Sequence, residues 1–164
     1  MIEIYTDGSC RNNGKKHASG GCAFVVIQDS QKLYEESFFS EETTNQRMEL
    51  LAAIKACNFI KNHFPDENVC IYSDSAYLIN CFSQRWWITW QYNGWKNVKG
   101  QPVANIDLWK QIIPFFKNNK FTFQKVKGHS RNRDSHSIYN NYVDLLAISA
   151  ARSIKEGKSE SSSN

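Results

Sequence analysis

A short, almost wholly apolar segment, VCIYS at residues 69–73, constrains the fold of this chain more than any other feature. A strand without polar alternation is expected where both faces of a sheet are covered, as in the parallel part of an α/β protein. A Leu- and Ala-rich segment at residues 44–61 precedes it and predicts a long helix, with Thr43 and Gln46 as its capping box and Pro65 after its end. These segments together predict a sheet with helices packed against it.

The N-terminal segments predict strands that pair differently. Residues 2–6, 22–28 and 32–39 are β-rich and are separated by turn-forming residues, which predicts an antiparallel meander. The later strands follow helices and should pair in parallel, so the fold class is α/β with a mixed sheet flanked by helices. The other predicted elements are a strand at 121–127, helices at 75–82, 86–92, 106–117 (interrupted by Pro114) and 138–155, and loops at 7–14, 93–102 and 128–137.

The composition fits one folded domain. The chain has 164 residues, 41% hydrophobic and 13% aromatic, which excludes a disordered chain. It contains no apolar run long enough to span a membrane and no N-terminal signal peptide. Five cysteines without a CxxC pair argue against a disulfide framework or a zinc site and favour a reducing, cytoplasmic location. We expect one domain at residues 1–155 and a disordered, Ser-rich tail at 156–164.

The charge is concentrated in the middle of the chain. Residues 85–133 contain 10 Lys or Arg residues and a single acid, Asp107, together with all five tryptophans. Such a block combines attraction to phosphates with surfaces for stacking, as in nucleic-acid-binding proteins. A solvated basic face over a tryptophan-rich core would have the same composition.

Four acids occupy positions that suggest a shared site. Asp7 and Asp74 each follow a predicted strand, and neighbouring parallel strands would bring both to one edge of the sheet. Glu49 and Asp144 lie among apolar residues of predicted helices, where a carboxylate needs a cation or hydrogen-bond donors. Hard oxygen ligands without evident Lys or Arg partners suit Mg²⁺ or Mn²⁺.

Three of these acids have ordinary structural alternatives. Asp7 precedes a glycine and could be a turn residue, and Asp74 could be a helix N-cap. Asp144 could favour the N-terminal end of its helix through the helix dipole. Capping does not explain Glu49, which lies inside its helix.

Six motifs resemble those of the type 1 ribonuclease H family, in its order and spacing. They are YTDGS at 5–9, TTNQRMEL at 43–50, YSDS at 72–75, GWK at 94–96, VKGH at 126–129 and DLLA at 144–147. The resemblance covers roughly residues 2–152 and is closest to the bacterial form. It implies a five-stranded mixed sheet in the order 3-2-1-4-5 and an enzyme that cuts the RNA strand of RNA–DNA hybrids.

The resemblance also implies roles for individual residues. Two Mg²⁺ ions, for which Mn²⁺ is expected to substitute, would be held by the four acids, and hydrolysis would leave 5′-phosphate and 3′-hydroxyl ends. His129 matches the loop histidine that assists proton transfer or product release. The expected catalytic and metal-binding residues are Asp7, Glu49, Asp74 and Asp144, with His129 as an auxiliary catalytic group. The expected substrate-binding residues are Asn13, Asn45 and Gln46 for the hybrid's minor groove, Thr44, Asn105 and Trp86 for the DNA strand, and Lys96 and Lys99 in the basic protrusion.

Three departures from the family pattern affect substrate binding. Glu42 stands where many relatives have an arginine in a DNA-phosphate pocket, so we expect that pocket to be weakened. The protrusion at 90–96 lacks the usual Lys/Arg cluster, and the loop between His129 and Asp144 is longer than in the common bacterial form. We expect the chain to act alone as a monomer, without an obligate protein partner or a membrane.

Two other functions remain open on the sequence. A nuclease of the same superfamily that cuts DNA would share the acids, but it would not need Asn13, Asn45 and Gln46 to read a 2′-hydroxyl. A catalytically silent hybrid-binding module would share the basic block, but it would not need all four acids.

Overall fold

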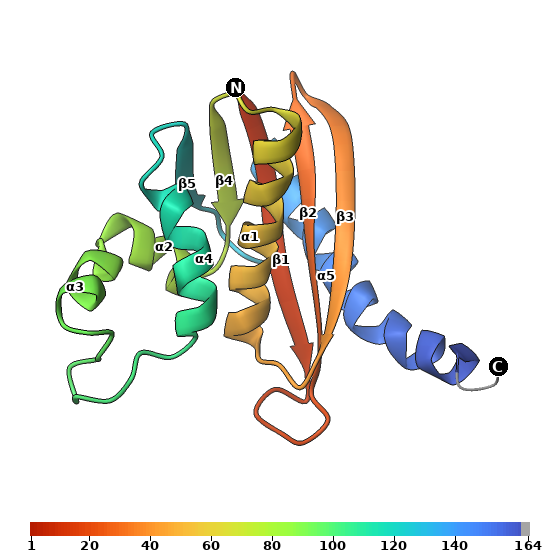
Figure 1. Ribbon diagram of the computed structural model, residues 1–164. Helices are drawn as coiled ribbons and strands as arrows, with labels where there is room; N and C mark the ends of the chain where they lie inside the picture. Colours follow the sequence, from red (N-terminus) through yellow and green to blue (C-terminus); the bar gives the residue numbers. More distant parts are fainter. Residues whose placement is uncertain (162–164) are drawn as a thin grey trace.

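A five-stranded sheet in the order β3-β2-β1-β4-β5 forms the centre of the molecule (Figure 1). This computed structural model describes the backbone of residues 1–161 and the side chains of residues 1–152. The α/β fold class and the strand order expected from the resemblance are both confirmed. The strands are β1 (Ile2–Arg11), β2 (Ser19–Gln28), β3 (Gln31–Glu41), β4 (Val69–Ser73) and β5 (Phe121–Lys125), and the helices are α1 (Asn45–His63), α2 (Ala76–Ser83), α3 (Trp86–Tyr92), α4 (Ile106–Phe116) and α5 (Ser135–Ser161).

The sheet changes from antiparallel to parallel at β1. Strand β1 pairs antiparallel with β2 along most of its length, but it pairs in parallel with β4 only from Ile2 to Tyr5. The predicted loop at residues 7–14 was therefore wrong in its first half, because residues 7–11 continue β1 and pair with residues 19–23 of β2. Pairing with a long partner strand outweighs the turn preference of the Asp-Gly-Ser sequence. Beyond Tyr5, one edge of β1 is left without a neighbouring strand.

Helices α1 and α5 cover opposite faces of the sheet (Figure 1). Ile4 of β1 packs in one core with Leu50 of α1, whereas the next residue, Tyr5, packs in a second core with Val143 of α5. This alternation follows from the two-residue period of a strand. The first core is the larger one and also contains the side chains of α2 and α4, including the fully buried Trp109.

Helix boundaries differ from the predictions where a side chain caps the first turn. Thr44, not Thr43, caps α1, because its Oγ accepts a hydrogen bond from the Arg47 N–H at 3.1 Å. Helix α5 begins at Ser135, three residues earlier than predicted, since the Asp134 carboxylate accepts the Ser137 N–H at 2.9 Å. Helix α4 runs unbroken through Pro114.

The disordered tail expected at 156–164 stays a prediction. Helix α5 continues to Ser161, and residues 162–164 lie outside the described residues. Lys155, Glu156 and Lys158 favour helix and no proline interrupts them. All five cysteines are free thiols, and no described helix is both long and apolar enough to cross a membrane.

Candidate active site

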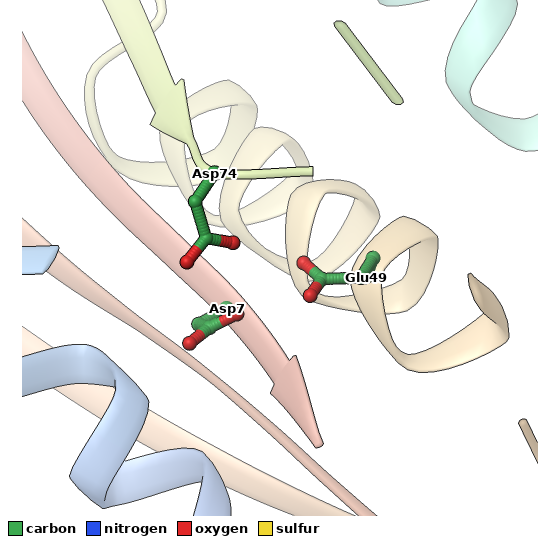
Figure 2. A group of neighbouring side chains, drawn as sticks. All are labelled: Asp7, Glu49 and Asp74. Atoms are coloured by element: carbon green, nitrogen blue, oxygen red, sulfur yellow. The ribbon is translucent and has the colours of Figure 1, made fainter. Parts of the chain in front are cut away.

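Three carboxylates from separate elements converge at the open edge of β1 (Figure 2). Asp7 projects from β1, Glu49 from α1, and Asp74 from the residue directly after β4. One oxygen atom of each lies within 4.8 Å of the others. Because β4 ends at Ser73 while β1 continues, Asp7 and Asp74 meet with no strand between them.

Gly8 allows α1 to approach β1 closely enough for Glu49 to reach Asp7. A Cβ atom at Gly8 would lie 2.4 Å from the backbone carbon of Met48 and 2.5 Å from the backbone nitrogen of Glu49. Any other residue would force the helix away from the strand. The glycine after Asp7 therefore serves helix packing and is not part of a turn.

Burial and mutual repulsion disfavour the ionised forms of these carboxylates. Burial, followed by the negative charges of Glu49 and Asp74, raises the pKa of Asp7 far above its usual range. Burial also raises the pKa of Glu49, and its buried Oε2 atom has no hydrogen-bond partner. Among the residues whose side chains are described, no Lys or Arg forms an ion pair with these carboxylates. A bound divalent cation would offset these charges, so the residues fit a metal site.

The structure rules against the structural alternatives for these acids. Ser75, not Asp74, caps α2, since its Oγ accepts the Leu78 N–H at 3.2 Å. Asp7 lies within a continuous strand. Asp144 lies in the third turn of α5, beyond the reach of an effect confined to the first turn.

Asp144 and His129 border the three clustered carboxylates. The Asp144 side chain is close enough to Asp7 to contribute to the raised pKa of Asp7, after burial and the charges of Glu49 and Asp74. His129 Nδ1 lies 3.9 Å from Asp144 Oδ2, and the His129 side chain is 82% exposed. The loop that carries His129 is tied to α5, because the Asn141 side-chain amide donates to the Ser130 carbonyl at 2.9 Å. The long loop thus still brings His129 to the site.

The predicted groove-reading residues lie together at the start of α1. Asn13 Oδ1 accepts a hydrogen bond from the Asn45 N–H at 3.1 Å, which joins the loop after β1 to the helix. Gln46 is exposed beside them. The Thr44 hydroxyl oxygen accepts the Arg47 N–H as the cap of α1.

Asn105 is held in a network that sequence reasoning missed. Its Oδ1 accepts from Arg47 Nη1 at 3.3 Å, and its Nδ2 donates to the Tyr77 hydroxyl at 3.1 Å. Arg47 also forms a bidentate pair with Asp107, and Trp109 Nε1 donates to the same Tyr77 hydroxyl. The only sequence signal was Arg47 itself, inside the TTNQRMEL motif.

The basic protrusion consists of α3 and the loop that follows it to Pro102. Trp86 and Trp90 are both half-buried, so neither is purely a core residue, and Trp90 also contacts the rings of Trp95 and Trp109. Lys96 and Lys99 are exposed on the loop, which an isolated bridge between Lys96 and Pro102 closes. Tryptophan packing therefore supports a surface that carries these lysines.

Glu42 borders a small cavity at the start of α1. The cavity has a volume of about 210 Å³. The Glu42 backbone is in the left-handed region with φ of 49° and its side chain is exposed. The lining residues are Ser40, Glu41, Glu42, Thr43, Arg47, Met48, Leu51 and Leu108. Two acids thus face the pocket where the resemblance predicts phosphate binding.

Comparisons with known proteins show the family to which the chain belongs. Residues 1–152 match the family model described as RNase H. A protein named Ribonuclease H from Syntrophomonas wolfei is 43% identical over 153 residues, which covers 93% of this chain and 97% of that protein. Another from Chlorobium phaeobacteroides is 44% identical over 151 residues and covers 92% and 95%. The solution structure of the PFV RNase H domain matches with a TM-score of 0.76 and 27% identity, covering 92% of this chain and 93% of that domain. The chain belongs to the ribonuclease H family.

Proposed function

We propose that this protein is an endonuclease that hydrolyses the RNA strand of RNA–DNA hybrids, with Mg²⁺ as its cofactor. The observation that carries the proposal is the convergence of Asp7, Glu49 and Asp74 within 4.8 Å in a chain of this family. Buried carboxylates with raised pKa values are typical of sites that hold hard cations.

The acids would hold two Mg²⁺ ions, and Mn²⁺ is expected to substitute. Asp7, which is 3% exposed, would hold them together with Glu49, Asp74 and Asp144. When bound, such ions generate hydroxide from water and stabilise the charge that develops on the leaving oxygen. Attack of water on phosphorus forms a new P–O bond and breaks the P–O3′ bond, and the departing O3′ takes up a proton. The products carry 5′-phosphate and 3′-hydroxyl ends.

His129 would exchange protons with the bulk solvent during this reaction. Its side chain is exposed, and its Nδ1 lies 3.9 Å from Asp144 Oδ2, at the border of the carboxylate cluster. An imidazole that faces solvent can take up or release a proton in each cycle. It therefore assists turnover without being essential to it.

Selection of the hybrid would come from the amides at the start of α1. Asn13, Asn45 and Gln46 would read the minor groove, where the 2′-hydroxyl distinguishes RNA from DNA. Amides suit this task because they donate and accept hydrogen bonds. The DNA strand would be held by Thr44, Asn105 and Trp86, and its phosphates attracted by Lys96 and Lys99.

We further propose that the enzyme works in the cytoplasm as a monomer. Five free cysteines fit a reducing compartment. All four acids, His129 and the amides of the proposed site belong to one chain, so catalysis would need no partner subunit.

Cleavage assays on three matched duplexes test the proposal. A labelled RNA–DNA hybrid, an RNA duplex and a DNA duplex of the same sequence are incubated with Mg²⁺, with Mn²⁺ or with EDTA. We expect metal-dependent cleavage of the RNA strand in the hybrid alone. Comparable cleavage of the DNA duplex would support a DNA-cutting nuclease instead. A retarded hybrid band without cleavage would support a silent binding module.

A further inference from the structure

Asn140 is a buried amide in direct contact with the carboxylate cluster. It lies in α5, four residues before Asp144, and its side chain is 1% exposed. Residues four apart share one face of a helix, so Asn140 and Asp144 both face the site. Asn140 Nδ2 donates a hydrogen bond to Asp74 Oδ2 at 3.3 Å.

The other polar atom of this amide has no partner. Asn140 Oδ1 is buried and forms no hydrogen bond in the structure. A buried acceptor without a donor is unfavourable, and such groups are rare in folded proteins. The unpaired Oδ1 of Asn140 therefore lowers the stability of the fold, whereas its Nδ2 supports Asp74. A local cost in stability of this kind is typical of functional positions.

Asp74 is confined from a second direction by Gly128. A Cβ atom at Gly128 would lie 2.8 Å from Asp74 Oδ2. The absence of a side chain at Gly128 thus leaves the space that the carboxylate occupies. Asn140 on α5 and Gly128 in the loop after β5 together define one orientation of Asp74.

The geometry points to Asn140 as a positioning residue that fixes the Asp74 carboxylate for metal binding. Carboxylate ligands need hydrogen bonds from outside the metal's own ligands to hold their orientation. Asp74 follows the last residue of β4, and the side chain of its neighbour Ser75 caps α2. The orientation of the Asp74 carboxylate therefore depends on hydrogen bonds such as the one from Asn140. This inference rests on the proposed function, because it assumes that Asp74 binds the metal.

Asn140 can be changed without moving α5. Val143 and Ala147 anchor the helix in the second core, and the His136 ring lies 2.5 Å from the Tyr5 hydroxyl at the first turn. Leucine has nearly the shape of asparagine and carries no polar atom. Asn140→Leu would remove the hydrogen bond to Asp74 and also the unpaired Oδ1.

Calorimetric titration with Mg²⁺ alone, in the absence of nucleic acid, tests the inference. For Asn140→Leu we expect the Kd for Mg²⁺ to rise at least about tenfold while Tm in EDTA stays the same or increases. In cleavage assays kcat should fall with little change in the KM for hybrid. Asn58→Leu, the same change on the exposed face of α1, is the matched control and should leave Kd, Tm and kcat unchanged.

Gly128→Ala provides a second test that leaves α5 intact. The added methyl group would displace the end of the Asp74 side chain, not backbone, so the fold should survive. We expect a weaker Kd for Mg²⁺ here as well. Unchanged Mg²⁺ affinity in both variants would overturn the inference, and so would a fall in Tm that accompanies the loss of affinity in Asn140→Leu. Cleavage of hybrid by the wild-type protein tests the proposed function separately.

Discussion

The Arg47 guanidinium donates two hydrogen bonds to the Asp107 carboxylate, at 2.9 and 2.7 Å, and so joins the start of α1 to the start of α4. The same guanidinium reaches Asn105, which precedes α4. The pair therefore couples two parts of the proposed DNA-strand site, the cap of α1 and Asn105.

Asp107→Asn should weaken the contact with Arg47 and lower the free energy of unfolding at neutral pH. The hydrogen bond from Arg47 lowers the pKa of Asp107, so its stabilising contribution is present above the unfolded pKa of about 3.9 and is lost as the pH falls through the lower folded pKa. Because the carboxylate is largely exposed, we expect a loss of at most about 1 kcal/mol in the free energy of unfolding. Urea denaturation at pH 7 and pH 3 measures it. A difference as large at pH 3 as at pH 7 would contradict the ionic origin.

Asp7→Asn should stabilise the metal-free protein while abolishing cleavage. Its folded pKa is raised, so above the unfolded pKa of about 3.9 folding must protonate a carboxylate that is ionised in the unfolded chain. This cost grows as the pH rises toward the folded pKa. We expect a gain on the order of 1–3 kcal/mol at pH 8 and almost none at pH 4.

Thermal unfolding in EDTA at both pH values tests the stability part of this prediction, and a band-shift assay tests hybrid binding, which should persist. Asp29→Asn, at the turn between β2 and β3, is a control that should change neither stability nor cleavage. Substantial cleavage by Asp7→Asn would exclude Asp7 as a metal ligand.

Gly8→Ala should separate Glu49 from Asp7. The new Cβ would contact the backbone of Met48 and Glu49, which cannot yield as a side chain would. We expect a loss of about 1–3 kcal/mol in stability and a larger relative loss of Mg²⁺ affinity. Chemical denaturation measures the loss of stability, and calorimetric titration measures the loss of Mg²⁺ affinity. Ser9→Ala, at the next position of β1, is the control for both. Wild-type affinity in Gly8→Ala would show that the approach of α1 is unimportant for the site.

His129→Ala should slow turnover by about 10²-fold and leave Mg²⁺ affinity unchanged. The ring is exposed and lies 3.9 Å from Asp144, so its removal should impair the proposed proton transfer without disturbing the fold. Steady-state cleavage kinetics across pH 5–9 measure the effect, with His63→Ala at the far end of α1 as the control. Complete inactivity, or no effect, would contradict an auxiliary role.

Local patterns predicted the α/β class and the clustering of acids, whereas the sheet order was predicted from the resemblance of six motifs to the ribonuclease H family. Asp74 follows an apolar strand, and Glu49 is a charged residue among apolar ones, so each is conspicuous by itself. The contribution of Asn140 was not accessible in this way. Asparagine is common on helices, and its burial against Asp74 becomes visible only when α5 is placed on the sheet.

The extent of β1 was missed for a related reason. Residues 7–11 have turn-like composition, and only their pairing with β2 makes them a strand. The Arg47–Asp107 pair likewise joins residues 60 positions apart, which no local pattern predicts. Errors therefore occurred where contacts between distant segments outweigh local preference.

Glu42→Arg should strengthen hybrid binding through the pocket at the start of α1. Glu42 borders this cavity beside Glu41 and Arg47, where an acid would repel the phosphate that the resemblance predicts there. Reversing its charge should make the dependence of log Kd on log salt steeper by about one or two units and increase affinity several-fold at low salt. Glu42→Gln should have about half the effect, because it removes the repulsion without adding a cation. Glu67→Arg, near the opposite end of α1, is the control for general electrostatic attraction. Equal gains for Glu42→Arg and Glu67→Arg in a fluorescence-anisotropy titration would show that net charge alone is responsible.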